Sequence, residues 1–461
     1  MSGLTDELLL AANDLSPVDR AFRERACVDP ELLSRSTFQV LDDDHELLTY
    51  RRQPWPTFLG REKLQAFKDA SLAASRLLRL VPERIFGGDP VRMSEFYGVH
   101  NPELVELLMA PPNGIAGAVS RGDLIDTPDG FKCIEFNMGA NLGGWETGIL
   151  AEMQLGIPAI ARFIHEHGLQ VSYTDTVHVL YEHLLDEALR REIARDGEVN
   201  IAFTTQWDSV LARSVTYGQY LNAEYRKVRE RIAPAVTGRV VRCNDSQFTV
   251  HDGGVYHGDV RIHAIIEVDS GATLPEVYQV FKLGKVLLYN GPNNFMMTSK
   301  RNVALLSEHR DSDCFSSAER EEIRRYFPWT ALVLPHYVDY GGERVFLPEL
   351  LVRERERFVL KDSLSAGGKG VRLGKFTPPA AWESRVAEAL DAGDWLAQEI
   401  LEFRPVAYQN GDYGCSPHNV IWGPFVFGNR YAGVILRMQP AADPGAVNLS
   451  LTATEGIVFE V

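Results

Sequence analysis

The chain has 461 residues, of which 45% are hydrophobic and 24% are charged, and its formal net charge is −16 at neutral pH. This acidic balance argues against a nucleic-acid-binding surface, which needs clustered basic side chains to neutralise phosphates. No apolar run reaches the roughly 18 residues that a membrane span requires, and the short apolar run near the N-terminus lacks the basic region of a secretory signal. We therefore expect neither a membrane partner nor secretion.

The five cysteines are scattered along the sequence, and no two of them form a Cys-x-x-Cys pair. This spacing favours neither a disulfide framework nor a cysteine-rich zinc site. We therefore expect buried or free thiols and a cytoplasmic protein.

In chain order, residues 1–115 are predicted to be mostly helical, and the apolar residues of 61–81 recur at helical spacing. Residues 121–145 combine a predicted hairpin with a loop that enters a helix, and residues 176–195 are again predicted to be helical. From 199 to about 270, buried-strand and helical patterns alternate, which indicates a small α/β unit.

The last third of the chain has the clearest local pattern. A predicted strand over 357–361 is followed by a Gly/Ser loop over 362–370 and a second strand over 371–376. Prolines then open a helix over 378–393, which stops at a glycine, and a further strand covers 395–401. The predicted order is strand, glycine loop, strand, helix, strand.

A charged hairpin is predicted over residues 121–137, RGDLIDTPDGFKCIEFN, where TPDG is a turn signal between two strand-like runs. Folding at this turn places Asp123 roughly opposite Glu135, with Asn137 on the same face as Glu135. Two facing carboxylates destabilise a hairpin unless a cation lies between them. These hard oxygen ligands suit Mg²⁺, and Arg121 on the same face could clamp a transferring phosphoryl group. Alternatively, Arg121 neutralises the acids as a structural ion pair.

The loop SAGGKG, residues 365–370, has glycines that let backbone amides approach phosphate oxygens closely. It is not a Walker A loop, because Gly370 follows Lys369 and the loop joins two strands. Lys361 ends the preceding strand and could reach a phosphate as a point charge. The alternative is a surface hairpin with a solvated lysine.

Two weaker signals accompany this loop. Gln398 and Glu399 interrupt an otherwise apolar strand, where backbone groups and a carboxylate could hold adenine and ribose. Ordinary alternation on a half-buried strand is the alternative. Lys300 begins an apolar-periodic helix, a position at which a lysine is usually only solvated.

Together these segments resemble circularly permuted ATP-grasp proteins and are similar to the synthetase domain of glutathionylspermidine synthase. The resemblance spans roughly 115–450 and rests on motifs in order: Arg121-x-Asp123, Glu135-x-Asn137, MMTSKRNVALLSE with Lys300, PWT at 328–330, VLKDSLSAGGKGV with Lys361, and AQEIL at 397–401. In ordinary ATP-grasp chains the metal ligands follow the phosphate-loop lysine, whereas here they precede it by more than two hundred residues. The implied fold class is α/β (α+β), with a helical N-terminal region and a small α/β unit of the kind that precedes ATP-grasp domains.

The resemblance also implies roles for individual residues. Lys300, Lys361 and the loop residues Ala366, Gly367, Gly368, Lys369 and Gly370 would contact ATP phosphates, and Gln398, Glu399 and Ile400 would hold adenine and ribose. Asp123, Glu135 and Asn137 would bind one or two Mg²⁺, and Arg121 would stabilise an acyl-phosphate and a tetrahedral intermediate. Arg437 and Asn448 could also line the site.

The implied activity is that of an ATP-dependent carboxylate–amine ligase, with ATP and Mg²⁺ as cofactors and small-molecule or peptide carboxylates and amines as substrates. The amidase domain and the substrate-binding residues of bifunctional glutathionylspermidine enzymes have no counterpart in the sequence. A phosphoryl-transfer enzyme without an amine acceptor and a non-catalytic nucleotide-binding scaffold stay open as alternatives. We expect three parts: 1–195 with the helical region and the metal-binding hairpin, 196–295 as the small α/β unit, and 296–461 with the phosphate loop. A homodimer is expected only because it is the commonest symmetric assembly.

Overall fold

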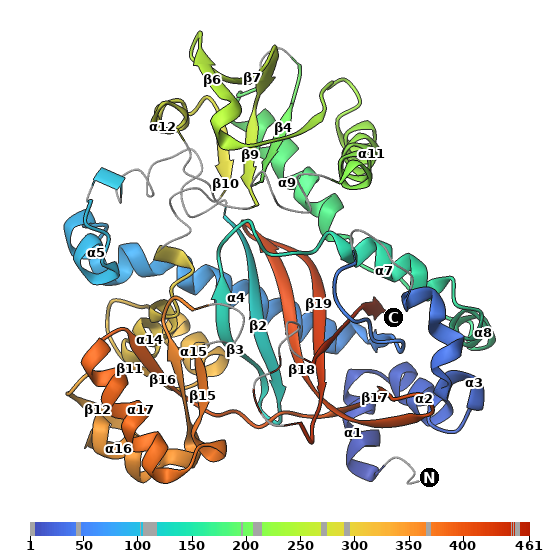
Figure 1. Cartoon of the computed structure of the whole chain (residues 1–461), viewed down its shortest axis with the longest axis vertical. Coiled ribbons are helices and arrows are strands. Elements are labelled where there is room, and N and C mark those ends of the chain that lie inside the picture. Colours follow the sequence, from blue (N-terminus) through green and yellow to red (C-terminus); the bar gives the residue numbers. More distant parts are fainter. Residues whose placement is uncertain are drawn as a thin grey trace.

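The structure is a computed structural model that describes residues 5–42, 48–101, 103–104, 118–194, 197–205, 214–268, 274–289, 296–365, 370–443, 445, 447 and 452–461. Figure 1 shows a tall twisted sheet at the centre, a parallel sheet above it and a smaller antiparallel sheet at the lower left. Within these described ranges, no helix has the length and apolar character needed to cross a membrane.

The central sheet has six strands, all of which pair antiparallel. Its order is β20–β19–β18–β2–β3, and β17 also pairs with β18. The strands are β2 (Val119–Thr127), β3 (Gly130–Asn137), β17 (Val406–Asn410), β18 (Gly414–Phe427), β19 (Arg430–Pro440) and β20 (Thr454–Gly456). The β2–β18 pairing therefore joins the first predicted part of the chain, 1–195, to the last, 296–461. The boundaries of these parts stay predictions.

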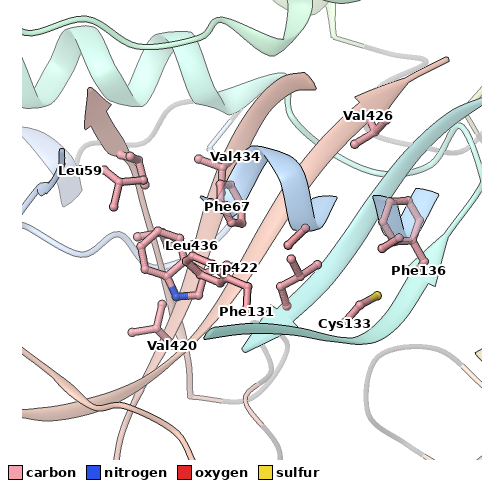
Figure 2. Close-up of a cluster of buried hydrophobic side chains, with 14 of the residues drawn as sticks. Leu59, Phe67, Phe131, Cys133, Phe136, Val420, Trp422, Val426, Val434 and Leu436 are labelled. Carbon is pink, nitrogen blue, oxygen red and sulfur yellow. The ribbon is translucent and has the colours of Figure 1, made fainter. Parts of the chain in front are cut away.

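One face of this sheet packs against the 26-residue helix α4 (Arg61–Phe86). The ring of Phe67 on α4 lies 5.0 Å from that of Phe131 and 5.5 Å from that of Trp422, centroid to centroid. Figure 2 shows these rings among the buried side chains of β3, β18 and β19. The helix predicted over 61–81 is confirmed and continues to Phe86, where Gly87 in the left-handed region (φ +64°) caps it.

The smaller antiparallel sheet contains the predicted pattern of the last third. Its order is β11–β16–β14–β15, with β11 (Thr330–Leu332), β14 (Phe358–Asp362), β15 (Val371–Leu373) and β16 (Trp395–Glu399), and α17 (Pro379–Ala392) connects β15 to β16. The prediction of a strand to residue 376 is wrong. β15 ends at Leu373, because the backbone of Gly374 comes so close to Arg355 that a Cβ there would lie 1.9 Å from the Arg355 carbonyl oxygen. The chain turns instead into η5 (Gly374–Phe376).

The small α/β unit predicted from 199 onwards is present as a parallel sheet of order β10–β9–β4–β5. Its strands are β4 (Ile201–Thr204), β5 (Val240–Cys243), β9 (Ala264–Glu267) and β10 (Leu287–Tyr289). Helix α11 (Val215–Ile232) connects β4 to β5, and a three-stranded antiparallel sheet of β6 (Phe248–His251), β7 (Gly254–His257) and β8 (Val260–Ile262) follows. The unit caps the top of the central sheet in Figure 1.

The remaining elements surround these sheets. The helices are α1 (Asp6–Leu15), α2 (Pro17–Ala26), α3 (Pro30–Leu33), α5 (Pro90–Tyr97), α7 (Glu146–Leu155), α8 (Pro158–Glu166), α9 (Thr176–Arg190), α12 (Pro275–Lys282), α14 (Arg301–Glu308), α15 (Ser317–Tyr326) and α16 (Leu347–Arg353). Short helical turns are η1 (Arg35–Asp42), η3 (Asp245–Gln247) and η4 (Arg355–Arg357), and the other strands are β1 (Thr57–Leu59), β12 (Tyr337–Tyr340), β13 (Glu343–Phe346) and β21 (Val458–Glu460).

Candidate functional site

The charged hairpin forms as β2 and β3, joined by the two residues between Thr127 and Gly130. The register pairs Asp123 with Glu135 and Arg121 with Asn137. Because directly paired residues share a face of the sheet, these four side chains lie on the face opposite α4. The hairpin prediction, including the opposition of the two acids, is confirmed.

Cations neutralise both acids of this hairpin. Arg437, on β19, forms an ion pair with Asp123, and the Nε atom of Arg121 lies 4.0 Å from an Asp123 carboxylate oxygen. Burial alone would raise the pKa of Asp123, but the guanidinium groups of Arg437 and Arg121 outweigh it and hold that pKa below its ordinary value. Glu135 is held by Lys300, whose Nζ atom lies 3.4 Å from its carboxylate. The alternative of a structural ion pair made by Arg121 is therefore met only by its 4.0 Å approach to Asp123, and Arg437 makes the closer ion pair.

A β-bulge in β3 connects the hairpin to the smaller sheet. Asp123 pairs with Glu135 but the next residue, Leu124, pairs with Cys133, so Ile134 is the extra residue. The Ile134 carbonyl accepts hydrogen bonds from Lys361 Nζ at 3.2 Å and from Gln398 Nε2 at 3.3 Å. The bulge thus brings β14 and β16, which carry these two side chains, against the acidic hairpin.

Lys361 is buried, with 5% of its surface exposed. Its Nζ atom also donates to the Gln398 side-chain oxygen at 2.7 Å. Burial lowers the pKa of Lys361, the nearby Lys300 lowers it further, and Glu135 opposes both effects. A buried ammonium held by neutral oxygen atoms is suited to receive an anionic ligand, because a new negative charge would compensate its desolvation.

The base of the glycine loop is built around Lys300 and Asp362. Lys300 Nζ donates to the Ser365 carbonyl at 2.5 Å, and Asp362 accepts from the amides of Leu364 and Ser365, each at 2.9 Å. Gly370 closes the loop, and a Cβ there would lie 2.1 Å from Ser365 Oγ. The predicted phosphate-binding residues Ala366, Gly367, Gly368 and Lys369 lie outside the described residues, as does Asn448.

The residues predicted to hold adenine and ribose do not share a face. Gln398 points toward the hairpin, and its amide also donates to Thr330 Oγ1 at 3.1 Å. Glu399 accepts instead from Tyr340 Oη at 3.0 Å and from Arg357 at 2.9 Å. The Ile400 amide donates to the Arg357 carbonyl at 2.8 Å. This alternation is the ordinary strand pattern that the sequence left open as an alternative.

The sequence analysis missed or left open three charged residues near the hairpin: Arg437, Glu455 and Glu146. Arg437 is opposite Ile421 in the strand register, and it forms its ion pair with Asp123 across β18, which lies between β19 and β2. Gly423 of β18 has no side chain on this face, and a Cβ there would lie 3.5 Å from Arg121 Cδ. Glu455, on β20, lies opposite Arg437 in the β19–β20 strand register and has no exposed surface. Burial raises the pKa of Glu455 well above its ordinary value, and the charge of Glu146 raises it further.

Glu146 is the first residue of α7 and accepts from the Gly144 amide at 2.9 Å. Burial raises its pKa, although backbone amides and the guanidinium of Arg121 favour its charged form. The double glycine before it, Gly143–Gly144, could have signalled a tight loop at this point, since both residues have positive φ. No local pattern signals Glu455, whose position depends on the sheet pairing.

The oxygen donors of the hairpin fit Mg²⁺. No cluster of three or more His, Cys, Asp or Glu side chains suited to a metal ion occurs among the residues that the structure describes. The two carboxylates and the Asn137 amide form a smaller set, which is the arrangement that Mg²⁺ uses when substrate phosphates and waters supply its remaining ligands. The assignment of Asp123, Glu135 and Asn137 as metal ligands stays a prediction.

No protein-family model and no curated protein sequence matches the chain. Among solved structures, a glutathione synthetase-like effector from Globodera pallida, determined in its apo form, matches with a TM-score of 0.56 and 13% identity over 95% of this chain and 99% of that chain. A structure provisionally assigned as a gamma-glutamylcysteine synthetase from Methylobacillus flagellatus KT matches with a TM-score of 0.40 and 10% identity over 84% and 88% of the two chains, which is too weak to carry an argument. The first match shows that almost the whole chain has the fold of a glutathione synthetase-like protein.

Proposed function

We propose that the chain is an ATP-dependent carboxylate–amine ligase that forms an amide or peptide bond through an acyl-phosphate. The observation that carries this proposal is the meeting of Lys361 and Lys300, from separate segments, at the acidic hairpin, where Lys300 lies 3.4 Å from Glu135. The fold likeness to a glutathione synthetase-like effector supports a ligase of this kind.

Local charge supports a polyphosphate ligand in spite of the net charge of −16. On the described hairpin face and its neighbours, the cations Arg121, Arg437, Lys300 and Lys361 face Asp123 and Glu135. Burial raises the pKa values of the neighbouring Glu146 and Glu455, which disfavours their charged forms, so the cations outnumber the carboxylates that carry a full charge. Partly buried cations attract phosphates more strongly than exposed ones, because solvent screens them less. We also propose that the ATP-grasp fold is circularly permuted, because the hairpin with the candidate metal ligands precedes the Lys361 strand.

In the proposed reaction, a carboxylate oxygen of the first substrate attacks the γ-phosphorus of ATP, the bond to the β-phosphate oxygen breaks, and ADP leaves. Lys361 and Lys300 would hold phosphate oxygens and offset the charge that moves toward ADP. An amine then attacks the acyl carbon, loses a proton, and releases inorganic phosphate. Arg121 would stabilise the acyl-phosphate and the oxyanion formed in this second step. Mg²⁺ held by Glu135, Asn137 and Asp123 would neutralise phosphate charge.

Hydroxylamine trapping tests the proposal. The purified protein is incubated with ATP, Mg²⁺, hydroxylamine and pools of carboxylates, and hydroxamate and ADP are measured. A ligase yields hydroxamate in amounts that match ADP, because hydroxylamine intercepts the acyl-phosphate. A phosphoryl-transfer enzyme yields ADP and a stable phosphorylated product without hydroxamate, and a scaffold binds ATP without turnover.

Variants connect this turnover to the site. Lys361→Ala, Arg121→Ala and Glu135→Ala are each expected to abolish hydroxamate formation, and Lys375→Ala is the matched control because Lys375 is exposed on the same small sheet region. Retained turnover in any of the three would remove that residue from its proposed role. Loss in the control as well would mean that the assay reports on folding instead of the site.

A further inference from the structure

Two cysteines from opposite ends of the chain meet beside the central sheet. Cys27 caps the C-terminal end of α2, and Cys415 lies on β18, where it pairs with Gln409 of β17. Their sulfur atoms lie 2.6 Å apart, although 388 residues separate them in sequence. A covalent sulfur–sulfur bond is about 2.05 Å long, so the two sulfur atoms already lie near bonding distance.

The surrounding contacts hold both residues in place. The Cys27 amide donates to the Arg23 carbonyl at 3.0 Å, and the Arg35 amide donates to the Asp412 carbonyl at 2.9 Å, which ties the N-terminal helices to the turn of the β17–β18 hairpin. Gln409 strengthens the same contact by donating to the Leu33 carbonyl at 3.4 Å. These hydrogen bonds hold the two segments together on either side of the sulfur pair.

We propose that Cys27 and Cys415 form a redox-modification site, at which a low-molecular-weight disulfide converts the two thiols into a disulfide bond between α2 and the β17–β18 hairpin. Both side chains are partly exposed, so such an oxidant can reach them. The hydrogen bond with Cys27 lowers the pKa of Cys415, and the positive charge of the buried Arg23 lowers it further, so Cys415 is the sulfur that forms the thiolate, the nucleophilic form. The contact with Cys415 and burial raise the pKa of Cys27.

The reaction is an ordinary thiol–disulfide exchange. One cysteine thiolate attacks a sulfur of the oxidant, the oxidant's sulfur–sulfur bond breaks, and one small thiolate leaves. The second cysteine thiolate then attacks the protein sulfur of the mixed disulfide, and the second small thiolate leaves. The two protons of the cysteines end on the two small thiols, so the protein loses two electrons and the oxidant gains them.

The remaining cysteines provide controls. Cys133 and Cys243 are buried, with 1% and 5% exposed surface, and Cys314 is partly exposed like the pair.

The bond would also fix two walls of a cavity of about 590 Å³, because Gln409 and Arg35 both line it. A cross-link that closes so long a loop restricts the unfolded chain, so it should raise the melting temperature.

The test treats the reduced full-length protein with glutathione disulfide and measures intact mass, peptide maps and melting temperature. We expect the loss of two hydrogen atoms, a single cross-linked peptide pair containing Cys27 and Cys415, and a rise of several degrees in melting temperature that dithiothreitol reverses. Cys314→Ser should behave like the wild type, whereas Cys27→Ser and Cys415→Ser should each lose both the cross-link and the shift.

Three outcomes would overturn the proposal: both cysteines still react with an alkylating agent after oxidation, the reaction stops at a glutathione adduct, or the cross-link joins another cysteine. The wild-type mass and peptide map decide between these outcomes even if a serine variant fails to fold. None of these readouts depends on ATP or on turnover, so the result is independent of the proposed ligase function.

Discussion

Replacement of Lys361 by methionine tests whether the site binds a nucleotide by its phosphates. Methionine retains most of the side-chain stem and removes the ammonium group. In the ligand-free protein this group donates to two neutral oxygen atoms, Gln398 Oε1 at 2.7 Å and the Ile134 carbonyl at 3.2 Å. Lys361→Met should therefore lose ATP affinity but keep most of its stability in the absence of ligand.

The magnitude follows from the burial of the ammonium group. Removal of one partner of a buried charge pair costs about 3–5 kcal/mol, which corresponds to a loss of ATP affinity between about 100-fold and about 4,000-fold. In the ligand-free protein, the two lost hydrogen bonds are offset by removal of a desolvated charge, and the Ile134 carbonyl keeps its bond from Gln398 at 3.3 Å. The free energy of unfolding without ligand should therefore change by only about 1 kcal/mol.

Calorimetric titration with ATP and Mg²⁺ measures the affinity, and thermal melts without ligand measure the stability. Lys375→Met is the matched control, because its ammonium group is exposed and lies 4.8 Å from the Phe376 ring centroid. Wild-type affinity in Lys361→Met would refute the assignment of Lys361 as a phosphate ligand. A large fall in the ligand-free melting temperature would instead identify Lys361 as a structural residue.

Three further variants probe the fold around the site. Gly370→Ala should weaken ATP binding by about 1–3 kcal/mol in the same titration, because its Cβ would overlap Ser365 Oγ at the loop base, and unchanged affinity would contradict this. Phe67→Ala should cost about 3–5 kcal/mol in a denaturant titration, since the buried ring packs on the central sheet. Burial raises the pKa of Glu455, so the carboxyl group stabilises the fold fully below its unfolded pKa and progressively less as pH rises through the folded pKa. Glu455→Gln should therefore melt at a higher temperature than the wild type at about pH 8 and at a similar one at about pH 4, and a constant difference between these limits would contradict the assignment.

The features that could be predicted from sequence are those fixed by short-range signals. The TPDG turn determines where β2 and β3 fold back, and the apolar spacing of 61–81 determines which face of α4 meets the sheet. In the same way, the prolines before 379 and the glycine at 393 mark both ends of α17. Each of these signals acts within a few residues, so no knowledge of distant segments is needed.

Other parts of the site depend on pairing between distant segments. Arg437 reaches Asp123 only because β2 pairs with β18, which follows it almost three hundred residues later, and β18 in turn pairs with β19, the strand that carries Arg437. Lys300 is an ordinary helix-start lysine until α14 and the hairpin are brought together, and its ion pair with Glu135 is then possible. The shortened β15 instead had a local signal, because the isolated Gly374 inside the predicted strand is typical of a close backbone approach, here to the Arg355 carbonyl.

The bulge at Ile134 explains how one strand serves both the core and the site. With Thr127 opposite Gly130, regular pairing would place Ile134 opposite Asp123, and Glu135 would follow Cys133 onto the core face. The extra residue reverses the alternation, so that Phe131, Cys133 and then Phe136 face α4, as Figure 2 shows, while Glu135 faces away from it. The carbonyl displaced from regular pairing then receives Lys361 and Gln398. The same irregularity thus preserves the hydrophobic core, opposes the two acids and anchors the lysine that we propose binds phosphate.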